Sequence, residues 1–229
     1  MVTGLIRSRM KSSVLGVMGG TFDPVHYGHL RLAEEARQSL GLGRVRIIPA
    51  GSPRHREEPH SSAEHRLAMT RLALADLPEF ELDTSEVRSG EPSYTVPTLE
   101  RLRVELGGER RLVLLMGVDA FLGLASWHHW RELFGLAHIA VATRPGYVLG
   151  REQMGEALGA EFAARFCDAH ESLADTPAGR ICTFAMTPLA ISATAIREIL
   201  LQGGSPRFLL PEAVLDYIRQ HHLYENRIA

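Results

Sequence analysis

The sequence predicts an α/β fold with a doubly wound, mainly parallel sheet and helices on both of its faces. Short apolar runs rich in β-branched residues alternate with longer stretches of helical period, which is typical of a parallel sheet covered on both sides. Hydrophobic residues make up 45% of the 229 positions and charged residues 23%, as in ordinary globular domains. A chain of this length buries one core, so we expect a single domain over 1–229.

Six segments of the chain have the composition of strands. Right-handed crossovers between them would place the connecting helices on both faces of the sheet. The expected strands are Val14–Met18, Val45–Pro49, a weaker Phe80–Val87, Leu112–Gly117, His138–Thr143 and Cys182–Met186.

The helices are expected from their caps and their apolar period. The first should begin near Pro24, with Asp23 as its N-cap, and stop at Gly41 or Gly43. The second covers 61–76, where Ser61 and Glu64 have the spacing of a capping box. Others are expected at Val96–Leu106, in the Ala-rich middle of 146–180, after Ser192 and over 211–222. The part 188–229 is therefore helical, and 1–12 is expected to be a flexible tail.

Net charge and cysteine usage restrict the classes of partner. Twenty-five basic and 27 acidic side chains leave a formal net charge of −2, so no chain-wide positive field exists to attract nucleic acid. No apolar run approaches the ~18 residues that cross a bilayer, so we expect a soluble protein without a membrane partner. Cys167 and Cys182 lack a close-spaced CxxC partner, and two such thiols suit a reducing cytoplasm. An oligomer is compatible with the sequence.

The stretch GGTFDPVHYGHL, residues 19–30, follows the first expected strand and opens the first expected helix. Ligands of open parallel sheets bind beyond the carboxyl ends of the strands, where this turn lies. Gly19 and Gly20 let a ligand approach the backbone closely, and the positive end of a helix dipole favours an anion. The stretch therefore predicts a phosphate site.

His26 and His29 are three residues apart, which places them on one helical face, in the first and second turns of a helix that begins at Pro24. Imidazoles there can donate hydrogen bonds to phosphate and, when protonated, add positive charge where phosphoryl transfer needs it. The alternatives are a metal-binding pair or two structural surface histidines. We expect no metal ion held by the protein itself, because no nearby third ligand except Asp23 completes a set.

A second stretch, ISATAIR at 191–197, also opens a helix after a strand-like run. Ser192 is its expected N-cap, and Thr194 and Arg197 share a face. An arginine so placed can bind two phosphate oxygens at once. Taken alone, the stretch is more consistent with an ordinary capped helix carrying a surface arginine. The pairing with the first motif favours a site for a phosphorylated ligand.

These two motifs resemble the signatures of the nucleotidylyltransferase superfamily with a His-x-x-His motif, in the forms T/SFDPxHxGH and ISxTxIR. Within it the chain most resembles the nicotinate-nucleotide adenylyltransferases over nearly its whole length. The supporting segments are IPAGSPRHR, PSYTVPTL, MGVDAFLGLASWHHW and LPEAVLDYIRQHHLY. The resemblance implies a Rossmann-like fold and a single nucleotidylyltransferase domain.

The resemblance also implies a reaction. ATP and nicotinate mononucleotide would give nicotinate adenine dinucleotide and pyrophosphate in NAD biosynthesis, with Mg²⁺ as cofactor. The attacking 5′-phosphate is already anionic, so catalysis reduces to positioning and charge neutralisation. The alternatives are a nicotinamide-mononucleotide or other small-phosphate adenylyltransferase, and an inactive nucleotide-binding regulator.

Site residues follow from the resemblance, position by position. It implies His26, His29 and Arg197 as catalytic groups at the ATP phosphates. It implies ATP binding by Gly19, Gly20, Thr21, Phe22, Gly117, Asp119, Ser192 and Thr194. It implies mononucleotide binding by Tyr94, Thr95, Trp127, His55, Arg56 and Arg144, although Trp127 alone is equally consistent with a core tryptophan. The chain departs from the family pattern at Ser52, Arg54 and Arg56, at Pro97 and at Ala193.

Overall fold

The computed structural model describes residues 14–53, 58–167, 173 and 175–225. The expected tail at 1–12 and the candidate residues His55 and Arg56 lie outside them. The chain groups into two compact units. The first unit holds residues up to Met18, Ala33–Arg46 and Tyr94–Pro188; the second holds Gly19–Leu32, Ile47–Ser93 and the residues from Leu189 on. The expected single domain stays a prediction.

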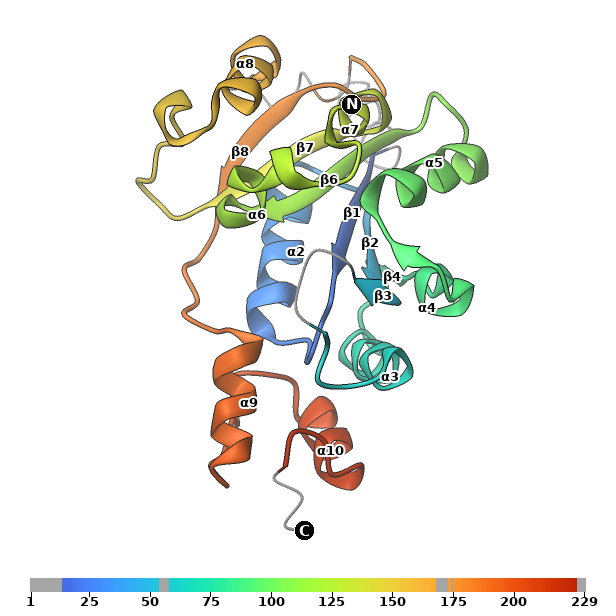
Figure 1. The fold of residues 1–229 in the computed structure, drawn as a ribbon, viewed down its shortest axis with the longest axis vertical. Coiled ribbons are helices and arrows are strands. Elements are labelled where there is room, and N and C mark those ends of the chain that lie inside the picture. Colours follow the sequence, from blue (N-terminus) through green and yellow to red (C-terminus); the bar gives the residue numbers. More distant parts are fainter. Residues whose placement is uncertain (1–13, 54–57, 168–172, 174, 226–229) are drawn as a thin grey trace, which may run out of the picture. The chain divides into compact units, whose positions relative to one another are not determined.

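A six-stranded sheet runs through the fold in the order β4-β2-β1-β6-β7-β8 (Figure 1). The pairs β1–β6, β6–β7 and β7–β8 are all parallel. The sheet confirms the predicted fold class. Its strands are β1 (Val14–Gly20), β2 (Arg44–Pro49), β4 (Phe80–Leu82), β6 (Arg111–Gly117), β7 (His138–Thr143) and β8 (Ile181–Ala185).

The strand order reverses at β1, which has β2 on one side and β6 on the other. In open α/β sheets, ligands bind beyond the carboxyl ends of the strands at such a point. The carboxyl end of β1 is the Gly19–Gly20 pair of the first motif. The topology therefore places this motif where a ligand site is expected. A separate parallel pair, β3 (Ser52–Pro53) with β5 (Pro92–Ser93), lies in the second unit.

The strands of the first unit are buried along their length, which explains their continuous apolar sequences. Every residue of β7 is buried, including His138. Its Nε2 lies 2.9 Å from Thr176 O, and its Nδ1 accepts from Arg180 N at 3.1 Å. This pattern fixes a neutral imidazole with the proton on Nε2, and burial lowers the pKa of His138. The histidine is a satisfied core residue.

Among the described residues, four α-helices lie wholly in the first unit, and a fifth, α2, has its C-terminal part there. Arg103 ties α5 to α7 by donating to Leu136 O at 2.8 Å, and the two helices lie side by side in Figure 1. The helix α5 stops at Gly107, where φ is 86°. The helices are α2 (Tyr27–Ser39), α5 (Thr95–Leu106), α6 (Val118–Leu122), α7 (Leu133–Leu136) and α8 (Glu156–Arg165); short 3-10 turns lie at Leu124–Ser126, Trp130–Glu132 and Arg151–Gln153.

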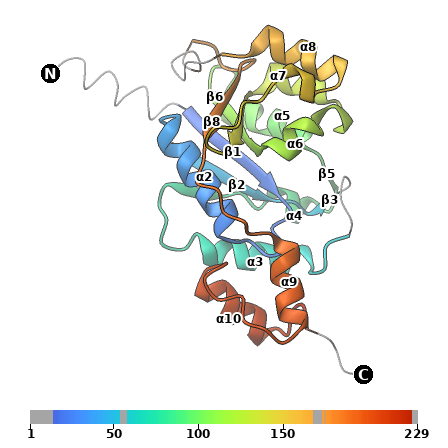
Figure 2. The same ribbon diagram turned by 90° about the vertical axis from the view of Figure 1, so that its left-hand side faces the viewer.

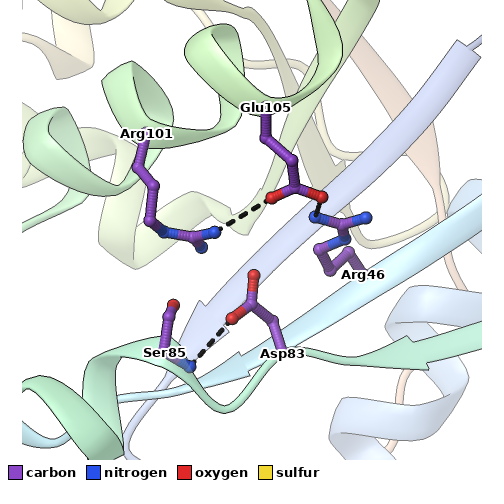
Figure 3. A network of polar contacts seen from close by, with 5 residues as sticks. All are labelled: Arg46, Asp83, Ser85, Arg101 and Glu105. Carbon is purple, nitrogen blue, oxygen red and sulfur yellow. Dashed lines mark hydrogen bonds and ion pairs between the residues drawn. The ribbon is translucent and has the colours of Figure 1, made fainter.

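Glu105 of α5 receives two guanidinium groups in the first unit, as Figure 3 shows. Arg46 of β2 donates at 2.8 Å and Arg101 at 3.1 Å. Because the glutamate side chain is 43% exposed, solvent screens both ion pairs, and each contributes at most about 1 kcal/mol.

The second unit holds the C-terminal helices. Figure 2 shows α3 beside α10, and His65 Nδ1 lies 3.0 Å from the Tyr217 hydroxyl across that contact. The helices are α3 (Ala63–Ala73), α4 (Ser85–Ser89), α9 (Ala193–Leu201) and α10 (Glu212–Gln220). No helix among the described residues has the length and apolar character needed to cross a membrane.

The predicted start of the first helix is wrong. The helix α2 begins at Tyr27, three residues after Pro24, although it does stop before Gly41, where φ is 61°. Asp23 does not cap it, because its carboxylate accepts hydrogen bonds from His60 N and Ser61 Oγ instead. The competing tertiary contacts decide where the helix can begin.

Two further expectations are corrected. The cap of α3 is Ser62, whose Oγ accepts from His65 N at 3.4 Å, while Ser61 is bound to Asp23. The strand expected over Phe80–Val87 ends at Leu82. There the Asp83 carboxylate accepts from Ser85 N at 2.9 Å, which turns the chain into α4 (Figure 3).

Candidate active site

The turn after β1 is built around Phe22. This residue is buried and has a φ of 51°, a left-handed conformation that is rare for a bulky side chain. A Cβ on Gly20 would lie 2.8 Å from the Phe22 ring, so any larger residue there would displace this buried ring. The ring also meets the His29 ring edge-on, with centroids 5.0 Å apart. Strained backbone held by packing is typical of a functional turn.

His26 and His29 occupy two capping positions of α2. The main-chain oxygen of His26 accepts from His29 N at 3.0 Å, so His26 is the N-cap and His29 is the third helical residue. In return, His26 N donates to His29 Nδ1 at 3.3 Å. This is the reach-back half of a capping box, with an imidazole in place of the usual Glu or Gln. The expectation that His26 lies inside the first helical turn is therefore wrong.

The capping contact fixes the tautomer of His29. Nδ1 accepts a hydrogen bond, so in the neutral ring the proton lies on Nε2. The two imidazoles stack, with centroids 3.7 Å apart and planes 23° apart. The structure thus confirms that the two rings lie together, although one of them precedes the helix.

His26 is held as a neutral ring. It is only 5% exposed, and burial lowers its pKa from 6.5 to about 4. Its Nδ1 is buried and has no hydrogen-bond partner among the described residues. Buried polar atoms are normally paired, and an unpaired one at a candidate site indicates a group whose partner arrives with a ligand. At neutral pH His26 therefore brings a polar ring to the turn, not the positive charge considered from the sequence.

The second motif meets the first within the second unit. Ser192 caps α9 as predicted, with its Oγ accepting from Ala195 N at 3.1 Å. Arg197 Nη1 donates to the main-chain oxygen of Asp23 at 2.7 Å, and its Nη2 reaches Thr194 Oγ1 at 3.4 Å. The predicted pairing of Thr194 and Arg197 on one face is confirmed. The ISATAIR helix therefore lies against the double-histidine turn.

Gly28 is a site residue that the sequence reasoning did not single out. A Cβ there would lie 3.0 Å from the His26 ring and 3.5 Å from Ile191 O of the second motif. The absence of a side chain at Gly28 therefore lets the His26 ring lie close to the backbone of this turn. The signal in the sequence is the glycine between the two histidines in HxGH.

Arg66 of α3 is a second residue that was missed. It is 1% exposed and donates to Thr21 O at 2.9 Å and to Gly51 O at 2.8 Å, as well as to the oxygens of Ala50 and Ser61. Thr21 belongs to the turn after β1, and Gly51 to the turn after β2. On its opposite side the second turn is held by Ser93 Oγ, which accepts from Gly51 N at 2.9 Å. Arg66 thus fixes two turns of the site through their backbone.

In the first unit, predicted adenosine-binding residues lie at the carboxyl edge of the sheet. Gly117 ends β6 in register with Ala142 of β7. Asp119 follows in the first turn of α6, and Arg144 follows β7; both are exposed. The three candidates Gly117, Asp119 and Arg144 therefore lie at the carboxyl ends of β6 and β7, the edge where ligands of open α/β sheets are expected.

The candidates for the nicotinate ring also gather in the first unit. Tyr94 is the N-cap residue of α5 and Thr95 its first residue. The Tyr94 ring packs on the His128 ring, with centroids 4.6 Å apart. Trp127 directly precedes His128 in the chain, so its backbone lies close to this contact. Trp127 is half-buried, whereas Trp130 is the buried core tryptophan. His128 was not predicted, and its place beside Trp127 is the signal that could have indicated it.

The cytidylyltransferase-like family model matches residues 17–199 of the chain. A protein of Dechloromonas aromatica (strain RCB) named "Probable nicotinate-nucleotide adenylyltransferase" is 57% identical over 215 residues, or 94% of this chain and 99% of that relative. A protein of Acidithiobacillus ferrooxidans with the same name is 46% identical over 212 residues, or 93% of this chain and 96% of that relative.

Among solved structures, the Plasmodium falciparum nicotinic acid mononucleotide adenylyltransferase complexed with NaAD is similar, with a TM-score of 0.68. The match covers 93% of this chain and 97% of that chain, and at 16% identity it shows the shared fold. The family model and the two bacterial relatives show more than the fold. The chain belongs to the nicotinate-nucleotide adenylyltransferases of the cytidylyltransferase-like family.

Proposed function

We propose that the chain transfers the adenylyl group of ATP to nicotinate mononucleotide, giving nicotinate adenine dinucleotide and pyrophosphate in NAD biosynthesis. The contact of Arg197 with the main chain of Asp23 carries the proposal, because it joins the two phosphate motifs in one unit. The names of the bacterial relatives support it. The Plasmodium falciparum relatives, complexed with NaAD in one structure and with APC in another, support substrates of this size and class.

The chemistry matches the groups present. An oxygen of the mononucleotide 5′-phosphate attacks the α-phosphorus of ATP, and the bond from that phosphorus to the bridging oxygen breaks. Pyrophosphate leaves with the electron pair. The attacking phosphate is already ionised at neutral pH, so no general base is needed. The protein has to align the two phosphates and stabilise the charge that develops between them.

We assign these tasks to the second unit. The Nε2–H of His29 donates to a phosphate oxygen, and the buried ring of His26 supplies a second polar contact. Arg197 brings the permanent positive charge, since its guanidinium stays protonated at any physiological pH. Ser192, Thr194 and the turn of Gly19, Gly20, Thr21 and Phe22 complete the ATP phosphate site.

The first unit would bind the two nucleosides. Gly117 and Asp119 meet the adenosine, where a carboxylate can accept from ribose hydroxyls. Tyr94, Thr95 and Trp127 surround the pyridine ring, with aromatic stacking and a hydroxyl donor. The resemblance also assigns Arg144 to mononucleotide binding, as it does His55 and Arg56, which lie outside the described residues. We place the reaction in the cytoplasm, which suits the buried thiol of Cys182.

Mg²⁺ is part of the proposal as a companion of ATP. No group of three His, Cys, Asp or Glu that could hold a metal ion occurs among the described residues. Imidazoles are poor ligands for this hard cation, and the Asp23 carboxylate already accepts three hydrogen bonds. The residues therefore fit an ion that is held by phosphate oxygens and water. When bound, it would neutralise charge on the leaving pyrophosphate.

A pyrophosphate-release assay tests the proposal. The purified protein is mixed with ATP, Mg²⁺ and either nicotinate mononucleotide or nicotinamide mononucleotide, and each mononucleotide is titrated. We expect turnover with both ATP and the acid present, and a lower kcat/KM with the amide. Preference for the amide would reassign the substrate. Tight ATP binding without pyrophosphate release would indicate a nucleotide-binding regulator instead.

A further inference from the structure

Tyr224 lies beyond α10, near the C-terminal end of the described residues. It ends the segment LPEAVLDYIRQHHLY, which holds none of the site residues expected from the sequence. Its hydroxyl nevertheless donates to Asp23 Oδ1 at 2.6 Å. The same hydroxyl lies 3.1 Å from Ser61 Oγ. The C-terminal segment therefore reaches the turn that contains the first phosphate motif, 201 residues earlier in the chain.

Asp23 connects this tyrosine to the candidate catalytic arginine. The residue is 4% exposed, and its carboxylate also accepts from Ser61 Oγ at 2.5 Å and from His60 N at 2.6 Å. Its main-chain oxygen accepts from Arg197 Nη1 at 2.7 Å. One buried residue thus anchors Tyr224 on its side chain and Arg197 on its backbone. Because both hydrogen bonds act on the same residue, holding the carboxylate also restrains the main chain that presents this oxygen to Arg197.

The surroundings of the hydrogen bond between Tyr224 and Asp23 keep the phenol protonated. The guanidinium of Arg66 acts on the Asp23 carboxylate, and that of Arg197 acts on the Tyr224 phenol. Burial, followed by the neighbouring carboxylate of Asp23, raises the pKa of the Tyr224 phenol. The phenol therefore keeps its proton, and remains a hydrogen-bond donor, over the physiological pH range. A donor to a buried carboxylate is among the stronger hydrogen bonds of a protein.

We propose that Tyr224 is a positioning residue for adenylyl transfer, which acts through Asp23 to hold Arg197 in its productive orientation. The inference rests on the function proposed above. It gives the C-terminal segment a task at the site, which is to order the FDP turn through the Asp23 carboxylate. Removal of the hydroxyl leaves Asp23 with its remaining donors, so we expect the fold to persist while the main-chain oxygen that accepts from Arg197 is held less firmly.

The chain offers a matched control for this test. Tyr217 of α10 also uses its hydroxyl for a contact with the region of α3, to His65 Nδ1 at 3.0 Å, but it does not bond to Asp23. Tyr224→Phe and Tyr217→Phe each remove one oxygen. We expect Tyr224→Phe to lower kcat about tenfold with little change in the KM for nicotinate mononucleotide, and Tyr217→Phe to leave both unchanged.

A double-mutant cycle separates positioning from general destabilisation. In an Arg197→Lys background, Tyr224→Phe should lower kcat by less than twofold further, because the arginine through which it acts is gone. The inference would be overturned if the losses in kcat of Tyr224→Phe and Arg197→Lys multiplied in the double variant. Equal kcat values for Tyr224→Phe and Tyr217→Phe would overturn it as well. The wild-type protein is the reference for the function itself. If it releases no pyrophosphate in the same assay, the proposed function fails, independently of Tyr224.

Discussion

His26 N donates to His29 Nδ1 across one turn, at 3.3 Å, and this contact ties the HxxH spacing to helix capping. Residues three apart are the N-cap and the third helical position, which are the two positions that a capping box joins. The spacing therefore does more than place two rings on one face. It makes one histidine orient the other and leaves the His29 proton on Nε2.

This geometry predicts different outcomes for two replacements of His29. His29→Asn keeps an acceptor near the place of Nδ1 but removes the Nε2 donor, so we expect near-normal stability and a loss of about 10²- to 10³-fold in kcat. His29→Gln keeps a donor near the place of Nε2, and Gln is a usual capping-box residue at this position, so it should retain more turnover at a similar stability. Steady-state kinetics and urea unfolding check both variants. The reverse ranking in kcat would show that Nδ1 is the important atom.

The buried His26 predicts how stability depends on pH. Its folded pKa of about 4 lies below its ordinary value of 6.5, so the unfolded chain binds more protons between these pH values. The contribution is fully present above the unfolded pKa and is lost as the pH falls toward the folded one. From about pH 7.5 to about pH 5 it amounts to a loss of about 2 kcal/mol in the free energy of unfolding. Urea unfolding of the wild type and of His26→Gln at both pH values isolates this amount, since the other titrating groups are common to both.

Gly28 predicts a packing effect on activity. In Gly28→Ala the new methyl group would press on the His26 ring at 3.0 Å, so the ring must shift. We expect kcat to fall about tenfold, with a small loss of stability. Gly108→Ala is the control, because a Cβ there meets nothing within 4 Å among the described residues. Similar kinetics for the two variants would mean that the close approach of His26 to Gly28 is irrelevant to turnover.

Arg66 predicts a large effect on stability. In Arg66→Met the main-chain oxygens of Thr21 and Gly51 lose their donor in a buried place, and we expect a loss of about 3 kcal/mol or more in the free energy of unfolding. Arg101→Met is the matched control, since it removes an exposed ion pair with Glu105 and should cost about 1 kcal/mol or less. Chemical denaturation with urea measures both. Equal losses would place Arg66 among ordinary surface arginines.

Local sequence signals predicted the parts of the fold that depend on local physics. The run His138–Thr143 is apolar enough to be buried on both faces, and the strand has these bounds in the structure. Ser192 caps α9, and Gly41 adopts the left-handed conformation expected after a helix. In each case neighbours in the chain supply the decisive interaction, so periodicity and residue type are sufficient.

Long-range contacts decided what the sequence could not. Asp23 is a residue type that often caps helices. Its carboxylate instead accepts hydrogen bonds from Ser61 and Tyr224, which are 38 and 201 residues away. Arginines in helices are usually exposed to solvent, yet Arg66 is buried and donates to main-chain oxygens. Partners of this kind follow from the tertiary fold. Hence the sequence indicated that the His26–His29 turn and the ISATAIR helix belong together, and it missed the groups that hold the turn in place.

The buried Nδ1 of His26 has no partner in the part of the chain that the structure describes. At this position, stability and turnover therefore favour different side chains. A buried polar atom without a partner lowers the stability of the ligand-free protein by about 1–3 kcal/mol. An apolar side chain of similar volume would recover that amount, so a selection for heat resistance alone should favour replacing this histidine and return inactive protein. Saturating substrate should raise the melting temperature of the wild type by more than it raises that of such a variant.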